Sequence, residues 1–94
     1  MKLKLNKLKA RDLLWDKQNR EHIRKHNLTP RQVEQVLLDQ NKIEDKGHSG
    51  RIAVIGRCGK RLVIIFIVPD GKKYYVVTAR DASKKDRQIY RANL

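Results

Sequence analysis

Residues 61–68 constrain the fold of this chain more than any other segment. Every position after Arg61 in this run is apolar, and most are β-branched, so a strand built from it would carry apolar side chains on both faces. Such a strand is stable only where both faces are covered. The run therefore predicts the central strand of a sheet, with packing on either side.

Turn residues bound this central strand and predict its neighbours. Residues 56–59 contain two glycines, and residues 69–71 read Pro-Asp-Gly, an order typical of tight hairpin turns. The preceding strand is expected at residues 51–55, after a loop at residues 47–50, and the following strand at residues 73–78. Two successive hairpins make the three strands an antiparallel meander.

Alternation along the strand at residues 73–78 assigns its side chains to two faces. One face carries Tyr74, Val76, Thr78 and Arg80, and the other carries Tyr75, Val77 and Ala79. We therefore expect Arg80 to end this strand, with apolar neighbours to support it and the other arginines of the meander beside it.

Capping residues predict two helices before the meander. A short apolar run at residues 13–15 is expected to form an edge strand, and Asp16 then caps a helix over residues 17–26. Residues 29–32 read Thr-Pro-Arg-Gln, which is a capping box with proline at the first helical position. The second helix therefore begins there, and it should end near residues 40–41.

A third helix follows the meander. Ser83 and Asp86 form another capping box, which opens a helix that runs through about Arg91. The order of elements predicts an α+β fold of two layers, with the helices packed on one face of the sheet. Residues 1–94 form one domain, in which the Lys/Leu-rich residues 1–12 are a basic extension that forms a strand, a helical turn or a mobile arm.

The charge of the chain favours a polyanionic partner. It has 23 Lys and Arg against 10 Asp and Glu, a formal net charge of +13 and an isoelectric point near 10.3. The two ends carry most of the basic residues, whereas residues 27–50 are nearly neutral. We therefore expect the two ends of the chain to form the anion-binding surface, although selection for solubility alone is the alternative.

Composition excludes several classes of protein. Aromatic residues make up only 5% of the chain, which argues against a broad base-stacking platform. Cys58 has no partner for a disulfide, which fits a reducing cytoplasm, and it reads as a tolerated small residue in a turn. No apolar segment follows the Lys-rich start, so we expect no signal peptide, and no apolar run is long enough to span a bilayer.

Arg80 is the first candidate for a contact with phosphate. An arginine side chain is permanently protonated and can donate two parallel hydrogen bonds to a phosphate, and a strand holds it in position. The alternative is a structural salt bridge to Asp81 or Glu34.

His22 and His26 lie four residues apart, so they share one face of the predicted first helix. The ordinary pKa of histidine, about 6.5, suits proton transfer. The spacing also permits a metal pair, but Ile23 stands where a zinc protease motif has glutamate, and no third ligand is placed nearby. We expect no metal and no other cofactor, with capping or packing as the alternative role of these histidines.

Short motifs follow one another in a specific order along the chain. They are Trp15-Asp16, Asn19, His22 and Lys25-His26, then Glu34-Gln35-Val36, Arg51, Gly56 and Gly59-Lys60-Arg61-Leu62, and finally Thr78-Ala79-Arg80-Asp81-Ala82, Arg87 and Tyr90. In order and spacing the chain resembles the BrnT toxins, RelE-like ribonucleases of bacterial type II toxin–antitoxin systems, over roughly residues 13–91. Where the family often reads Lys-His-Gly after the first helix, this chain has His26-Asn27; asparagine also tolerates a left-handed backbone, so the turn should be kept.

The resemblance implies a RelE-like fold and an activity that cuts RNA without a metal. Several such toxins cut messenger RNA at the ribosome and so inhibit translation. A cognate antitoxin neutralises them by covering the active face, and the complex commonly binds its own operator DNA. The expected partners are therefore an antitoxin protein, RNA, and operator DNA only through the antitoxin, with no membrane.

The resemblance and the residue chemistry together indicate a candidate site. Metal-free cleavage requires a base for the 2′-hydroxyl, a cation for the charge on phosphorus and an acid for the leaving 5′-oxygen. Solvated positions are the alternative for Arg51 and Arg61, a capping or solvated role for Glu34, and packing of the last helix for Tyr90. The candidates for catalysis are Arg80, His26, His22, Lys25 and Glu34, and those for contacts with RNA or phosphate are Arg51, Arg61, Arg87 and Tyr90.

Three functions are compatible with these observations. The first is an endoribonuclease toxin, the second is a nucleic-acid-binding module without catalysis, and the third is an inactive toxin homologue that acts through its antitoxin and operator. All three require a basic face, so charge does not separate them. What separates them is whether Arg80, a histidine and another arginine converge in one concave site.

Overall fold

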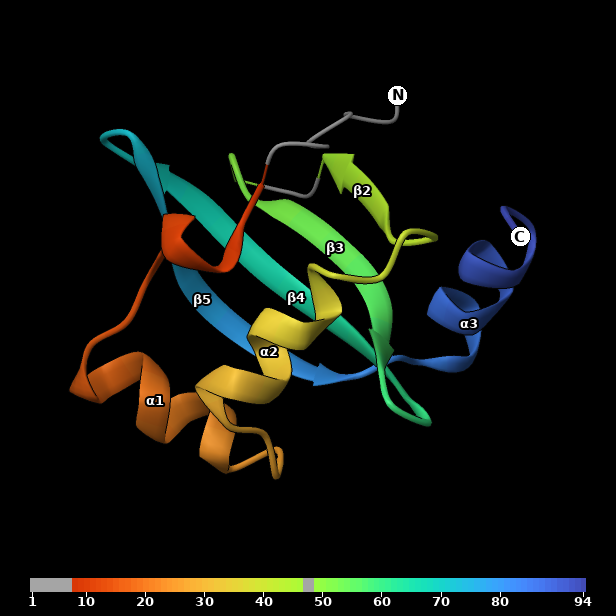
Figure 1. Ribbon diagram of the computed structural model, residues 1–94, viewed down its shortest axis with the longest axis horizontal. Coiled ribbons are helices and arrows are strands. Elements are labelled where there is room, and N and C mark those ends of the chain that lie inside the picture. The colour runs from red at the N-terminus through yellow and green to blue at the C-terminus, as the bar shows by residue number, and fades with distance from the viewer. Residues whose placement is uncertain (1–7, 47–48) are drawn as a thin grey trace.

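The computed structural model describes residues 8–46 and 49–94, which fold around a five-stranded mixed sheet with strand order β1-β5-β4-β3-β2 (Figure 1). β3, β4 and β5 form the predicted antiparallel meander. At the edges, β1 pairs in parallel with β5, and β2 pairs antiparallel with β3. In chain order the elements are a 3-10 helix (Ala10–Asp12), β1 (Leu13–Leu14), α1 (Lys17–Arg24), α2 (Pro30–Val36), β2 (Ile43–Lys46), β3 (Ile52–Cys58), β4 (Arg61–Asp70), β5 (Lys73–Asp81) and α3 (Lys84–Arg91).

The central strand β4 is covered on both faces, as its sequence predicts. Val63, Ile65 and Ile67 belong to a core that includes residues of α1 and α2, which we call the α1/α2-side core. Leu62 and Ile64 belong to a second core with Tyr90 of α3, which we call the α3-side core. The expectation that all three helices pack on one face was therefore wrong. The link from β5 to α3 is short and is anchored by the amide of Ala82, which donates to the carbonyl of Leu62 at 2.9 Å, and α3 then covers apolar side chains that would otherwise face water.

Local capping signals position the helix starts as predicted. The side chains of Asp16, Thr29 and Ser83 accept hydrogen bonds from the amides of the residues three positions later, at 2.8, 3.2 and 3.1 Å. The helix ends differ, since α1 stops at Arg24 and α2 stops at Val36. Both are followed by hydrogen-bonded turns that redirect the chain. Asn27 has a φ of 57°, which confirms the left-handed turn after the first helix.

The edge strand β2 was not predicted. Its residues read Ile-Glu-Asp-Lys, a polar and short segment without a strong strand pattern. Ile43 pairs with Ile55 of β3, and both are buried in the α3-side core, so tertiary packing makes this segment a strand. The loop predicted at residues 47–50 lies partly outside the described residues; Ser49 and Gly50 form a turn.

A β-bulge in β5 reverses the faces that strict alternation predicts. Ile67 pairs with Val76, but the preceding residue Phe66 pairs with Thr78, so Val77 is the extra residue between them. Tyr74 and Val76 consequently pack on the α1/α2-side core, while Thr78 and Arg80 lie on the α3 side. The prediction that all four share a face was wrong, and β5 also continues past Arg80 to Asp81.

Part of the basic N-terminal extension belongs to the core. Leu8 is buried in the α1/α2-side core, and residues 10–12 form the short 3-10 helix. Residues 1–7 lie outside the described part of the chain.

Candidate functional site

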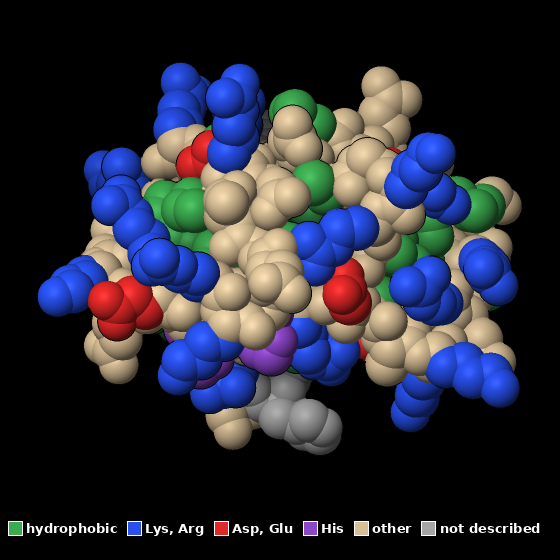
Figure 2. Space-filling model, turned by 90° about the horizontal axis from the view of Figure 1, so that it is seen from below, with side chains coloured by type: hydrophobic (Ala, Val, Ile, Leu, Met, Phe, Trp, Pro, Cys, Tyr) green, Lys and Arg blue, Asp and Glu red, His purple; other side chains and the backbone are tan. Residues whose placement is uncertain are grey.

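Several candidate residues lie at one end of the sheet, which we call the basic end. We define it as the turn between β3 and β4, Arg61 at the start of β4, Arg80 and Asp81 at the end of β5, and residues 25–27 after α1. It lies at the bottom of Figure 1, and Figure 2 looks onto it. The described histidine side chains appear there among many Lys and Arg side chains and few acidic ones.

Arg61 holds the basic end together. Its guanidinium donates to the carbonyls of Asn27 at 2.7 Å and His26 at 3.1 Å, and its Nε donates to Oδ1 of Asp81 at 3.0 Å. These carbonyls follow the end of α1, where a helix leaves acceptors without partners. Arg61 therefore anchors this turn to the sheet, a contact that neither of its predicted roles includes.

Arg80 lies on the α3 side of the sheet. Its side chain is held by hydrogen-bond acceptors at the end of β5 and in the first turn of α3. Its Nη1 is 3.1 Å from the carbonyl of Asp81 and 3.4 Å from Oδ2 of Asp86, and its guanidinium carbon lies 5.7 Å from the centroid of the Phe66 ring. The side chain is still 40% exposed, so it stays accessible to a ligand. The sequence suggested Asp81 or Glu34 as salt-bridge partners, whereas the carboxylate in contact is that of Asp86.

Asp86 combines the helix cap with the contact to Arg80. Burial by itself would raise the pKa of Asp86, but the hydrogen bond from the amide of Ser83, the contact with the Ser83 side chain and the positive charge of Arg80 outweigh it and lower this pKa. The carboxylate is therefore ionised at neutral pH and favours one orientation of the arginine. At 3.4 Å the contact is long for a charge-assisted hydrogen bond.

The two histidines are exposed on α1 and just after it. The ring centroids of His22 and His26 are 6.3 Å apart, with the rings tilted by 38°. Arg61 ties the backbone of His26 to the residue that follows Arg80, which brings His26 and Arg80 to the same end of the sheet. Lys25 is also exposed here, beside His26.

The other candidates are not gathered at the basic end. Arg51 lies just before Ile52, which pairs with Ile67 of β4. Ile67 is about 20 Å along β4 from Arg61, so Arg51 lies near the opposite end of the sheet. Glu34 is half-buried on α2, and Arg87 is exposed on α3.

Tyr90 is buried and packs the last helix against the sheet, which was the alternative to a contact with RNA. Its hydroxyl donates to Oδ2 of Asp39 at 2.7 Å, and the guanidinium carbon of Arg57 lies 5.6 Å from its ring centroid. Sequence reasoning missed Asp39 and Arg57. The alternation of side chains along β3 is the one sequence signal that could have indicated Arg57. Asp39 lies in a loop and shows no characteristic spacing from the other candidate residues.

Asn19 belongs to the family motif and is 1% exposed. Its side-chain amide donates to the carbonyls of Leu14 at 2.9 Å and Val76 at 3.1 Å, and its oxygen accepts from the amide of Asp16. It therefore joins β1, α1 and β5, and the motif at this position maintains the fold.

Two features are absent from the part of the chain that the structure describes. Within it, no three His, Cys, Asp or Glu side chains gather closely enough to hold a metal ion. No helix among the described residues has the length and apolar character needed to cross a membrane.

A protein-family comparison gives one match. A family model described as "Ribonuclease toxin, BrnT, of type II toxin–antitoxin system" matches residues 15–86, which include α1, α2, strands β2 to β5 and the start of α3. Comparison with curated proteins gives no match, and neither does comparison with solved structures. The matched region contains the whole basic end.

Proposed function

The chain belongs to the BrnT family of ribonuclease toxins from type II toxin–antitoxin systems, and from this premise we propose that it is a metal-independent endoribonuclease that cleaves messenger RNA and inhibits translation. Membership in such a system implies an antitoxin partner. In the same proposal the protein acts in the cytoplasm, on RNA that is free or on the ribosome, and operator DNA is bound only by its complex with the antitoxin. The order of two helices, a meander and a last helix supports placing it among RelE-like folds.

The observation that carries this proposal is the pair of contacts made by Arg61. It donates to the carbonyl of His26 and to the carboxylate of Asp81, the residue after Arg80. His26 and Arg80, far apart in the sequence, therefore come to the same end of the sheet, with the Arg80 side chain on the α3 face and α1 packed on the other face. Arg61 acts here as a positioning residue.

The chemistry then follows from these side chains. The imidazole of His26 takes the proton from the 2′-hydroxyl, and the 2′-oxygen attacks phosphorus. Arg80 stabilises the added negative charge on the phosphoryl oxygens. The bond to the 5′-oxygen breaks as that oxygen receives a proton, for which Lys25 and His22 are the candidates. The products are a 2′,3′-cyclic phosphate and a free 5′-hydroxyl.

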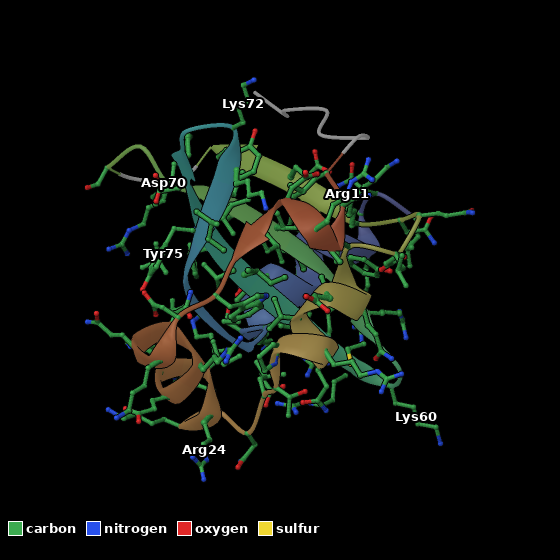
Figure 3. All side chains as sticks on the ribbon, turned by 60° about the vertical axis from the view of Figure 1, so that its left-hand side comes forward. Arg11, Arg24, Lys60, Asp70, Lys72 and Tyr75 are labelled. Carbon is green, nitrogen blue, oxygen red and sulfur yellow. The ribbon has the colours of Figure 1, made fainter. Side chains whose placement is uncertain are left out.

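Substitution of Arg80 tests the proposal. Overexpression of the wild type should arrest growth, and Arg80→Ala should abolish the arrest while circular dichroism and thermal unfolding stay near those of the wild type. Lys72→Ala is the matched control, because it removes a cation from the exposed β4–β5 turn at the far end of the sheet (Figure 3). If the wild type and Arg80→Ala arrest growth equally, or if neither does, the proposal fails.

One observation favours a second candidate, a protein that binds RNA without cutting it. Arg80 is already in contact with Asp86 and Phe66 in the free protein, which is an arrangement suited to holding a ligand as much as to catalysis. The purified protein with EDTA and a ribosome-free RNA transcript separates the two. Fragments with cyclic phosphate ends support the nuclease, and retention of intact RNA supports the binding protein.

A further inference from the structure

Part of the α3-facing side of the sheet is not buried under the last helix. The buried residues of this core lie near Tyr90 and include Ile43, Ile55, Leu62 and Ile64. Ala53 and Phe66 only border that core and are half-buried, as is Thr78 beside them. An aromatic ring on the central strand is therefore accessible on an open part of the sheet.

The neighbours of Phe66 in its own row are small. On β3 its pairing partner is Ala53, and on β5 it is Thr78. Both side chains are small, so the row Ala53–Phe66–Thr78 is a flat strip with one ring at its centre. The β5 bulge places Thr78, and with it Arg80, on this side.

The adjacent row on the same face supplies a cation. Arg80 pairs with Ile64, two residues along β4 from Phe66, which is a separation of roughly 7 Å between rows. Its guanidinium already lies over the Phe66 ring, 5.7 Å from the centroid. The ring therefore accepts a planar group on its open face, and a phosphate bound by Arg80 would be held one row away.

We propose that Phe66 stacks on a base of single-stranded RNA next to the phosphate held by Arg80, and this inference rests on the RNA substrate of the proposed function. Stacking on a single ring is tolerant of base identity, because every base has a π face. When the phosphate attracts the guanidinium of Arg80 away from the ring, the base takes its place. Phe66 is thus a positioning residue for the substrate.

The surroundings favour RNA over an apolar protein segment. The formal net charge of the chain is +13, and Arg80 places a cation against the ring, with Asp86 beside it and Asp45 on the strand beyond Ala53. The row Ala53–Phe66–Thr78 contains one large apolar side chain, between an alanine and a threonine. An aromatic ring beside an arginine suits one nucleotide, with its base on the ring and its phosphate on the cation.

The test uses binding of an RNA oligonucleotide that is 2′-O-methylated throughout. It lacks the 2′-hydroxyl needed for cleavage, so affinity is measured separately from catalysis, by fluorescence anisotropy. We expect Phe66→Leu, which keeps most of the apolar volume, to weaken binding about tenfold, whereas Phe66→Trp should retain or strengthen it. Leu38→Ala is the matched control, because it removes an exposed apolar side chain in the turn after α2, which packs on the opposite face of the sheet, and it should leave the affinity unchanged.

An abasic oligonucleotide with the same backbone provides the second arm. Wild type and Phe66→Leu should bind it equally, because no base is left to stack. Equal affinities for the base-containing RNA, or no binding of it by the wild type, would overturn the inference and leave the strip to a protein partner. Cleavage of unmodified RNA is scored independently: a protein that does not cleave but shows Phe66-dependent binding keeps the inference and loses the nuclease proposal.

Discussion

The hydroxyl of Tyr90 donates a hydrogen bond of 2.7 Å to the carboxylate of Asp39, 51 positions earlier in the chain. The same carboxylate accepts the amides of Asn41 and Arg57, each at 2.9 Å. The guanidinium of Arg57 lies against the Tyr90 ring. One anionic side chain thereby connects α3 to β3 and to the turn before β2, and it holds the helix that closes the second core.

Loss of this hydroxyl should destabilise the protein. We expect Tyr90→Phe to lower the free energy of unfolding by about 1–2 kcal/mol, because a partly buried carboxylate loses a donor while the ring still fills its place. Urea unfolding followed by circular dichroism measures the change. In Tyr75→Phe, a hydrogen bond to the exposed Asp16 is lost, so the effect should be smaller; an equal effect would contradict the interpretation (Figure 3).

The stability of the protein should depend on Asp39 at acid pH. Burial by itself would raise the pKa of Asp39, but the hydrogen bonds from Tyr90, Asn41 and Arg57 and the charge of Arg57 outweigh it and lower the pKa below its ordinary value of 3.8. A lowered pKa contributes stability that is present above the ordinary value and is lost as the pH falls through the folded-state value.

Comparing the stability of the protein at two pH values isolates this contribution. Between about pH 6 and about pH 3, the wild type should lose more stability than Asp39→Asn, which has no carboxylate to protonate at this position. Urea midpoints at both pH values measure the difference. Parallel losses in the two proteins would show that other carboxylates account for the acid sensitivity.

Arg61 should stabilise the turn after α1. We expect Arg61→Lys to lower the free energy of unfolding by about 1–3 kcal/mol, because an ammonium on a flexible chain cannot reproduce three donors fixed in one plane. Hydrogen exchange should become faster at the amides of residues 26–28. Lys60→Ala is the control, since Lys60 points into solvent from the adjacent turn and its removal should change neither quantity (Figure 3).

Gly56 should not tolerate a side chain. A Cβ at this position would lie 2.9 Å from Cγ1 of Val36 and 3.0 Å from its carbonyl oxygen, so α2 would have to move away from the sheet. We expect Gly56→Ala to lower the free energy of unfolding by about 1–3 kcal/mol.

A second glycine separates crowding from backbone strain. Gly59 has open space around it and a φ of +61°, so Gly59→Ala should cost only about 1 kcal/mol, from the left-handed conformation alone. Thermal unfolding of both variants measures the difference. A smaller cost at Gly56 than at Gly59 would contradict the close approach of α2.

Much of the fold could be predicted because its signals are local. A capping residue and its partner lie three positions apart, so the starts of all three helices follow from a few adjacent side chains. The meander follows similarly, since apolar β-branched runs and turn residues act over short distances. The family resemblance rested on the order of such motifs, and it is confirmed by the match over residues 15–86.

The candidate site was less predictable because its geometry depends on contacts between distant segments. Arg61 was expected to contact phosphate, but no local pattern places the carbonyls of His26 and Asn27 within its reach. Strict alternation likewise did not predict that Arg80 lies on the α3 side of the sheet.

The sequence by itself determined the type and order of most elements, the buried central strand and the basic character of the surface, because each depends on residue chemistry within a few positions. Tertiary structure alone decided that residues 43–46 form a strand, that α3 covers the second face and that Val77 is an extra residue in β5. These features arise where separate segments compete to bury apolar surface and pair their backbone groups. A one-residue change in pairing moves every following side chain to the other face, and here it places Arg80 beside Phe66.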